Sequence, residues 1–133
     1  MAYPTTYRYT RDHEWIKVKD DLGTVGLTDY AQCQLSDIVF VELPGVGTGL
    51  EAGKPLGVVE SVKAANDIYS PVSGDVIQVN GELRDAPEKI NVDPHCAGWL
   101  IKVRLNNPAE VDALMDAGSY EAYVALSEKE GSD

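Results

Sequence analysis

Short runs in which apolar and polar residues alternate occupy most of residues 7–105. Alternation with a period of two places successive side chains on opposite faces, so each run predicts a β-strand with one buried face. In the run 14–19, Ile16 and Val18 share one face while Lys17 and Lys19 share the other. We predict strands over residues 7–10, 14–19, 24–27, 38–43, 75–80 and 97–105, together with one strand on either side of Lys63.

One of these strands and the glycine-rich segment after it need separate interpretation. Residues 38–43 are the most strongly β-prone run in the chain, and we predict a core strand there. Four glycines follow between Gly45 and Gly53, but a phosphate-binding loop ending at Lys54 would need glycine where Thr48 stands and a hydroxyl residue where Pro55 stands. These glycines are therefore interpreted as turn residues.

Helices are predicted at three places. Thr28 can cap a short helix over residues 29–34. Residues 82–93 are polar and predict a loop with a helical turn or two. After residue 105, Asn107 followed by Pro108 and Glu110 predicts a helix start, and Gly118 is expected to end that helix. Ser119 is expected to cap a last helix through residue 127, followed by a charged tail over 128–133 that frays.

These elements predict a mainly β fold with short helices at the C-terminus. The length suits one domain over residues 1–133, with a β core over 7–105 and helices over 107–127. At least seven short strands at this spacing are typical of a sandwich or a small flattened barrel.

Composition narrows the possible partners. The chain has 22 acidic and 11 basic residues, a net charge of -11, so it would repel nucleic acid and favour encounters with basic patches on proteins. No apolar run reaches the length of a membrane helix, and residues 1–10 lack the features of a targeting peptide, so we expect a cytoplasmic protein without membrane contact. Cys33 and Cys96 stand apart from each other and from any histidine cluster, which predicts reduced thiols and no metal site.

Lys63 is the candidate for chemistry. It lies among apolar neighbours at the tip of the predicted hairpin, a rigid base with an exposed end that suits a lysine presented to another protein for modification. A lysine amine is a poor nucleophile until something activates it, which a modifying enzyme using an activated acid could do. The alternative is an ordinary solvated turn lysine.

At this point the sequence resembles a known family. Residues 59–74, from Val59 through Lys63 to Gly74, resemble the lipoyl-attachment segment of the glycine cleavage system H proteins. Further segments of that family are matched in the same order by residues 13–15, 26–32, 37–44, 98–103 and 114–123. The resemblance covers nearly the whole chain, so a chance match of one motif does not explain it.

The resemblance implies a barrel-sandwich hybrid of the lipoyl-domain type, with lipoate joined by an amide to Lys63. The implied function is to carry an aminomethyl group from the decarboxylating glycine dehydrogenase to the tetrahydrofolate-dependent aminomethyltransferase. Dihydrolipoamide dehydrogenase would then reoxidise the carrier, and a lipoate-attaching enzyme would load it. It further implies a monomeric carrier without catalysis of its own.

The resemblance also implies roles for four acidic residues. Glu14 and Asp67 match residues that hold the loaded arm against the carrier, and Asp12 is a third candidate for that cleft. Glu60, three residues before Lys63, is a candidate for recognition by the ligase. Without the resemblance, Glu14 would be interpreted as a surface acid at a strand edge, Asp67 as an acid in a turn and Glu60 as a solvent-facing strand residue.

Several other functions remain alternatives. A lipoate relay donor to other complexes would have the same sequence features. A biotinyl carrier would flank its lysine with methionines, whereas Val62 and Ala64 stand here. A lipoyl domain of a 2-oxoacid dehydrogenase typically has aspartate at the position of Val62. A hydrolase that uses Ser61 or Ser73 would be expected to have a G-x-S-x-G motif around the serine, and neither serine has one. His13 and His95 are interpreted as structural residues.

Overall fold

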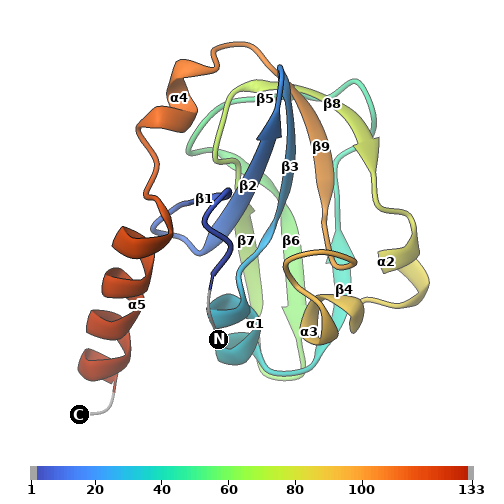
Figure 1. Ribbon diagram of the computed structural model, residues 1–133. Coiled ribbons are helices and arrows are strands. Elements are labelled where there is room, and N and C mark those ends of the chain that lie inside the picture. Colours follow the sequence, from blue (N-terminus) through green and yellow to red (C-terminus); the bar gives the residue numbers. More distant parts are fainter. Residues whose placement is uncertain (1–2, 132–133) are drawn as a thin grey trace.

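The computed structural model describes residues 3–131, which form two antiparallel sheets and five helices (Figure 1). The first sheet has the strand order β1-β2-β3-β9-β8-β5 and the second has the order β4-β6-β7. No strand pairing in the described residues closes the two sheets into a continuous barrel. The mainly β fold with C-terminal helices is therefore confirmed. The strands are β1 (Arg8–Tyr9), β2 (Glu14–Lys19), β3 (Leu22–Leu27), β4 (Ile38–Glu42), β5 (Gly49–Leu50), β6 (Pro55–Ser61), β7 (Ala65–Tyr69), β8 (Gly74–Val79) and β9 (Ile101–Leu105).

The two sheets share one hydrophobic core. Ile16 and Val103 enter it from the six-stranded sheet, and Val59 and Ile68 enter it from the three-stranded sheet. Gly57 permits the close pairing of β6 with β4, because a Cβ there would lie 2.2 Å from the Glu42 carbonyl oxygen. The strands around the core therefore form a rigid base for the β6–β7 hairpin.

The prediction of a core strand over residues 38–43 is wrong. β4 lies at an edge of the three-stranded sheet, and Val39 and Phe40 are 54% and 49% exposed. Only Ile38 of this strand is fully buried. High β propensity describes how well a residue fits a pleated surface, and it does not distinguish a central strand from an edge strand.

Helix α1 (Asp29–Leu35) begins where the sequence predicted. The Thr28 hydroxyl accepts a hydrogen bond from the Ala31 N–H at 3.2 Å, as expected of an N-cap. The two short helices α2 (Glu82–Asp85) and α3 (Lys89–Val92) are the helical turns expected within residues 82–93. The strand predicted over residues 97–105 is shorter than expected, since β9 begins at Ile101.

The C-terminal helices begin and end at other residues than predicted. Helix α4 (Ala109–Asp112) ends well before Gly118, and helix α5 (Ala117–Gly131) includes Gly118 in its first turn. The Asp116 carboxylate, not Ser119, provides the N-terminal cap by accepting a hydrogen bond from the Ser119 N–H at 2.8 Å. Helix α5 also continues through residues 128–131, where we expected fraying, and residues 132–133 lie outside the described part.

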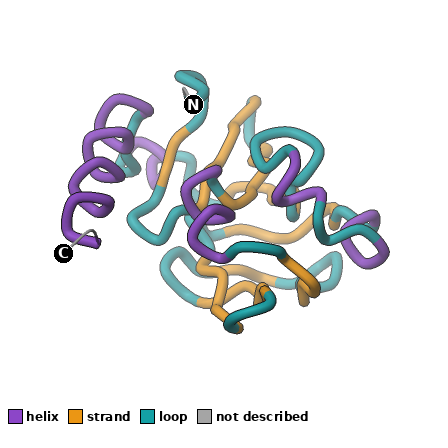
Figure 2. The backbone as a smooth tube through the Cα atoms, turned by 90° about the horizontal axis from the view of Figure 1, so that it is seen from below, coloured by secondary structure: helices purple, strands orange, loops and turns teal. Residues whose placement is uncertain are grey.

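An aromatic cluster joins α5 to the strands. Figure 2 shows this helix at one side of the sheets. Tyr120 is fully buried and stacks on Tyr9 of β1 with ring centroids 4.7 Å apart. Trp15 of β2 belongs to the same cluster. The helix is therefore packed next to the loop between β1 and β2, which lines the candidate site described below.

Candidate functional site

Lys63 lies in the tight turn between β6 and β7, as predicted. The turn is held by Ser61, whose hydroxyl accepts hydrogen bonds from the backbone N–H groups of Lys63 and Ala64 at 3.3 and 3.2 Å. The Val62 N–H donates to the Asp37 carbonyl at 3.0 Å, which ties the turn to the segment before β4. The Lys63 side chain is exposed. The local structure thus combines a fixed backbone with an accessible amine.

A cleft of about 440 Å³ lies beside the same hairpin. It brings together Asp12 and Glu14 from the β1–β2 region and Asp67 from β7, which is an edge strand of its sheet. Three of the predicted site residues therefore share one cleft, although they are far apart in the sequence. Its other walls are formed by Arg11, His13, Leu27, Ala31, Gln34, Leu35, Val59, Asn66 and Tyr69.

Glu14 is the buried acid of the cleft, with only 2% of its surface exposed. One carboxylate oxygen accepts a 2.6 Å hydrogen bond from the Thr10 hydroxyl, and the other accepts a 3.4 Å hydrogen bond from the Tyr69 N–H. Burial raises the pKa of the Glu14 carboxyl from its ordinary value of 4.5 to about 7. The hydrogen bond from Thr10 opposes this rise, whereas the negative charge of Asp12 adds to it.

The other two acids are exposed at the rim of the cleft. The backbone N–H of Asp12 donates to the Thr10 hydroxyl at 3.2 Å, so the same threonine supports both Asp12 and Glu14. Asp67 is paired through its strand with Val58 of β6, and it lies four residues after Lys63 in the sequence. At about 3.3 Å per residue of extended chain, the Asp67 backbone lies at most roughly 13 Å from that of Lys63.

Glu60 lies apart from this cleft. It is half-buried on β6, where its Cα partners are Phe40 on one side and Ala65 on the other. It is close to the turn that presents Lys63, and it is not among the residues that line the cleft. The structure therefore separates the presenting hairpin, with Lys63 and Glu60, from the acidic cleft beside it.

The loop between β1 and β2, which lines the cleft, is fixed by helix α5, and no local sequence pattern connects this helix with the site. His13 adopts a left-handed backbone conformation with φ of 70°, and its Nδ1 is hydrogen-bonded to the Tyr120 hydroxyl at 2.8 Å. The same hydroxyl is hydrogen-bonded to the Thr28 hydroxyl at 2.7 Å. The Tyr123 hydroxyl donates to the Arg11 carbonyl at 3.0 Å. Residues 11–13 are therefore held by hydrogen bonds to helix α5, near the C-terminal end of the chain.

Both histidines have structural partners, as interpreted from the sequence. His95 accepts a hydrogen bond from the Asp29 N–H through Nε2 at 3.0 Å. Burial lowers the pKa of both His13 and His95, which favours their neutral forms. Both cysteines are free and exposed. Among the side chains of residues 3–128 no cluster of three His, Cys, Asp or Glu could hold a metal ion, and no helix in the described part of the chain could span a membrane.

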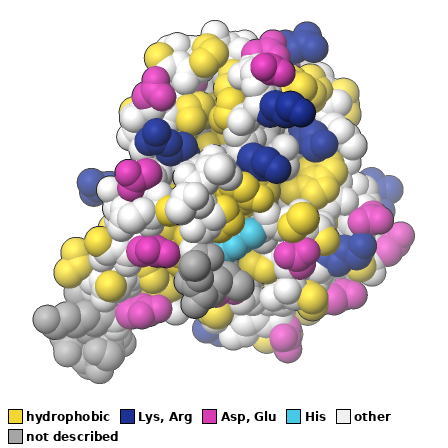
Figure 3. Space-filling model, viewed as in Figure 1, with side chains coloured by type: hydrophobic (Ala, Val, Ile, Leu, Met, Phe, Trp, Pro, Cys, Tyr) yellow, Lys and Arg dark blue, Asp and Glu magenta, His cyan; other side chains and the backbone are white. Residues whose placement is uncertain are grey.

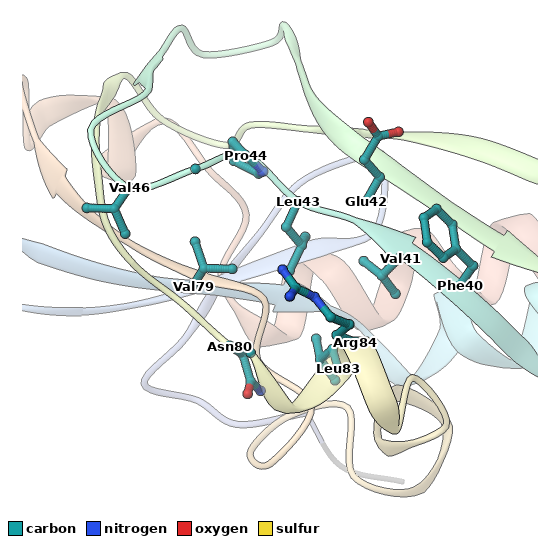
Figure 4. Close-up of a pocket in the computed structure, with 12 residues that line it drawn as sticks. Phe40, Val41, Glu42, Leu43, Pro44, Val46, Val79, Asn80, Leu83 and Arg84 are labelled. Carbon is teal, nitrogen blue, oxygen red and sulfur yellow. The ribbon is translucent and has the colours of Figure 1, made fainter.

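A second hollow, of about 460 Å³, lies between β4 and α2 (Figure 4). Val41 and Leu43 point toward Leu83 and Arg84, while the carboxylate of Glu42 points away from them. The hollow thus offers apolar side chains and one guanidinium group. This chemistry does not suit a cation, so the acidic cleft is the better candidate for holding one.

Comparison with known proteins finds relatives that match nearly the whole chain. Residues 7–127 match the family model described as glycine cleavage H-protein. The glycine cleavage system H protein of Acidobacterium capsulatum is 60% identical over 124 residues, which cover 93% of this chain and 95% of that protein. The corresponding protein of Carboxydothermus hydrogenoformans is 52% identical over 128 residues, covering 96% of each chain. The crystal structure of a glycine cleavage system H protein from Mycobacterium marinum superposes with a TM-score of 0.84 at 37% identity, covering 95% of this chain and 99% of that one.

Proposed function

The chain belongs to the glycine cleavage H-protein family, and we propose that it is a lipoyl carrier whose arm is attached to Lys63. The single observation that best supports this assignment is the exposed Lys63 amine on a turn fixed by Ser61, beside a cleft that contains three carboxyl groups. The amine would form an amide with lipoate that a ligase has activated. Glu60, which flanks the turn, is proposed as a residue that the ligase recognises.

Lipoate supplies a pair of sulfurs that can accept an aminomethyl group from the decarboxylating glycine dehydrogenase, deliver it to the aminomethyltransferase and be reoxidised by dihydrolipoamide dehydrogenase. The chain itself contributes attachment, reach and protection. A tethered group has a high effective concentration at every active site that the carrier docks with. We therefore assign no catalytic residue to this chain.

The cleft fits a cargo that bears an amine. Glu14, Asp12 and Asp67 offer negative charge, while Leu27, Ala31, Leu35 and Val59 line the walls with apolar groups. An ammonium group near Glu14 would lower the pKa of this carboxyl and favour its ionised form. The apolar walls would exclude water from the cargo while the carrier travels between enzymes.

The proposal is tested by intact mass measurement and peptide mapping after incubation of the chain with a lipoate ligase, ATP and lipoate. We expect a single lipoyl increment confined to the peptide that contains Lys63. The Lys63→Arg variant keeps the positive charge and should gain no mass. It should also be inactive in a reconstituted glycine cleavage assay.

Two results would contradict the proposal. An increment on another peptide, or an increment with biotin and biotin ligase in place of lipoate, would mean that the cargo has been assigned wrongly. A normally active Lys63→Arg variant would show that this lysine does not carry the transferred group.

A further inference from the structure

Four basic side chains gather on the outer surface of the six-stranded sheet. Lys17 and Lys19 lie on β2, and Lys102 and Arg104 lie on β9, with one strand, β3, between them. Strand spacing and rise place them near the corners of a rectangle of roughly 10 by 7 Å. Figure 3 shows several Lys and Arg side chains together on the upper part of the viewed surface. We call Lys17, Lys19, Lys102 and Arg104 the basic face.

The centre of the basic face is formed by β3. Leu22 is the Cα partner of both Lys19 and Arg104, and Thr24 is the Cα partner of both Lys17 and Lys102. Leu22 is 37% exposed. The surface thus has an accessible apolar centre between four cations, an arrangement that offers a partner both contact area and charge.

These cations lack carboxylate partners within the described residues. Among the described side chains, those of residues 3–128, the only ion pair joins Lys89 of α3 and Glu82 of α2. Asp75 is the Cα partner of Arg104 across β8 and β9, yet it forms no ion pair with it. Like charges separated by about a Debye length or less repel one another. This repulsion therefore lowers the stability of the isolated chain, and carboxylates of a partner would reduce the repulsion by neutralising the four cations.

The rest of the chain has the opposite charge. Four of the 11 basic residues belong to the basic face, which leaves seven basic residues against 22 acidic ones over the remainder. An acidic protein surface would be repelled by most of this molecule and attracted only here. Such a distribution fixes the orientation of an encounter and suppresses the wrong ones. The same net charge argues against binding of nucleic acid, because its phosphates would extend beyond the basic face and be repelled by the acidic remainder of the surface.

The basic face is also separate from the proposed carrier site. Lys63 lies in the turn between β6 and β7 of the three-stranded sheet, and Figure 1 shows this turn at the lower end of the molecule and the β2–β3 turn at the upper end. A protein bound to the basic face would therefore leave the Lys63 turn, and an arm attached to it, accessible.

We propose that the basic face docks an acidic surface on one of the enzymes that the carrier serves, so that the chain is held while its arm reaches the active site. This inference rests on the proposed function, because it takes the partner from among the enzymes of that system. It adds a docking surface remote from Lys63.

The test compares two double variants with the same change in net charge. Lys17→Glu with Lys102→Glu reverses two opposite positions of the basic face. Lys54→Glu with Arg84→Glu reverses two exposed basic residues elsewhere. Each lipoylated carrier is titrated separately into assays of the three purified enzymes, at low and at high salt.

We expect the basic-face variant to raise the apparent KM for the carrier by about tenfold with one enzyme at low salt, with kcat unchanged. The difference should shrink at high salt, where the charges are screened. The control variant should stay within about twofold of the wild type. Both variants should accept lipoate at Lys63 as the wild type does, which shows that the hairpin is intact.

A basic-face variant that matches the control with all three enzymes would overturn the docking proposal and leave the carrier function standing. Binding of a duplex oligonucleotide by the wild type at physiological salt, lost in the basic-face variant while KM is unchanged, would assign the surface to nucleic acid instead. Failure of wild-type Lys63 to accept lipoate would overturn the carrier function, and with it the identity of the docking partner.

Discussion

The buried carboxylate of Glu14 accepts a 2.6 Å hydrogen bond from the hydroxyl of Thr10. That hydroxyl also accepts hydrogen bonds from the backbone N–H groups of Asp12 and Glu14. One threonine side chain therefore sets both the position of the buried acid and the backbone of the turn before it. Charge-assisted hydrogen bonds of this length are among the stronger ones in proteins.

Replacing Thr10 by valine should raise the pKa of Glu14 further, because the charged form loses its best donor. The free energy of unfolding should fall by about 1–3 kcal/mol, since the Asp12 and Glu14 N–H groups also lose their acceptor. Thr10→Ser, which keeps the hydroxyl, should restore most of both properties. The pKa is measured from the carbon-13 shift of the Glu14 carboxyl, and an unchanged pKa in Thr10→Val would contradict the assigned role.

Glu14 also makes the stability of the chain depend on pH. Its pKa in the folded state is about 7, above the ordinary value of 4.5, so the folded state binds the proton more tightly than the unfolded state between these values. Stability should therefore decrease as pH rises from about 5 to 8. Glu14→Gln is neutral throughout and lacks this penalty.

Denaturant unfolding at several pH values checks this prediction. The wild type should lose on the order of 3 kcal/mol relative to Glu14→Gln between pH 5 and pH 8, from 1.36 kcal/mol for each unit of pKa shift. A difference between the two proteins that stays constant over this range would mean that Glu14 ionises normally.

The two acids that differ in burial should contribute unequally to holding a charged cargo. Glu14→Gln should speed loss of the aminomethyl group from the loaded carrier more than Asp67→Asn does, because an exposed ion pair is worth only about 0–1 kcal/mol. Asp75→Asn, on β8 and outside the cleft, has the same change in charge and serves as the control. Ammonia release from the isolated loaded carrier is the measurement, and equal rates in all three variants would exclude a holding role for the cleft acids.

The sequence was sufficient for the features that depend on nearby residues. The exposure of Lys63 follows from its position in a turn flanked by two strands. The cap at Thr28 follows from a threonine directly before the first residue of a helix, and its hydroxyl accepts from the Ala31 N–H. The candidate acids came from the family resemblance, and the structure brings Asp12, Glu14 and Asp67 to one cleft. The turn at Lys63 and the cap at Thr28 can each be recognised within one short segment of the chain, whereas the cleft is formed by segments that are distant in the sequence.

The features that depend on distant residues were missed. The exposure of Phe40 depends on the absence of a strand beyond β4, which propensity does not encode. The burial of Glu14 is completed by the Tyr69 backbone, 55 residues away. The contact of His13 with Tyr120 spans 107 residues, and no local pattern indicates it.

That last contact leads to a prediction about helix α5. Tyr120→Phe removes the hydroxyl that is hydrogen-bonded to both His13 and Thr28, and it should lower the free energy of unfolding by about 1–3 kcal/mol. Because His13 has a left-handed backbone conformation that other contacts must maintain, residues 10–14 should also exchange their amide hydrogens faster. Tyr123→Phe removes the single hydrogen bond to the Arg11 carbonyl and should have a smaller effect, since its hydroxyl contact is exposed. If Tyr120→Phe lowers stability while exchange at residues 10–14 is unchanged, α5 supports the fold without fixing the loop that lines the cleft.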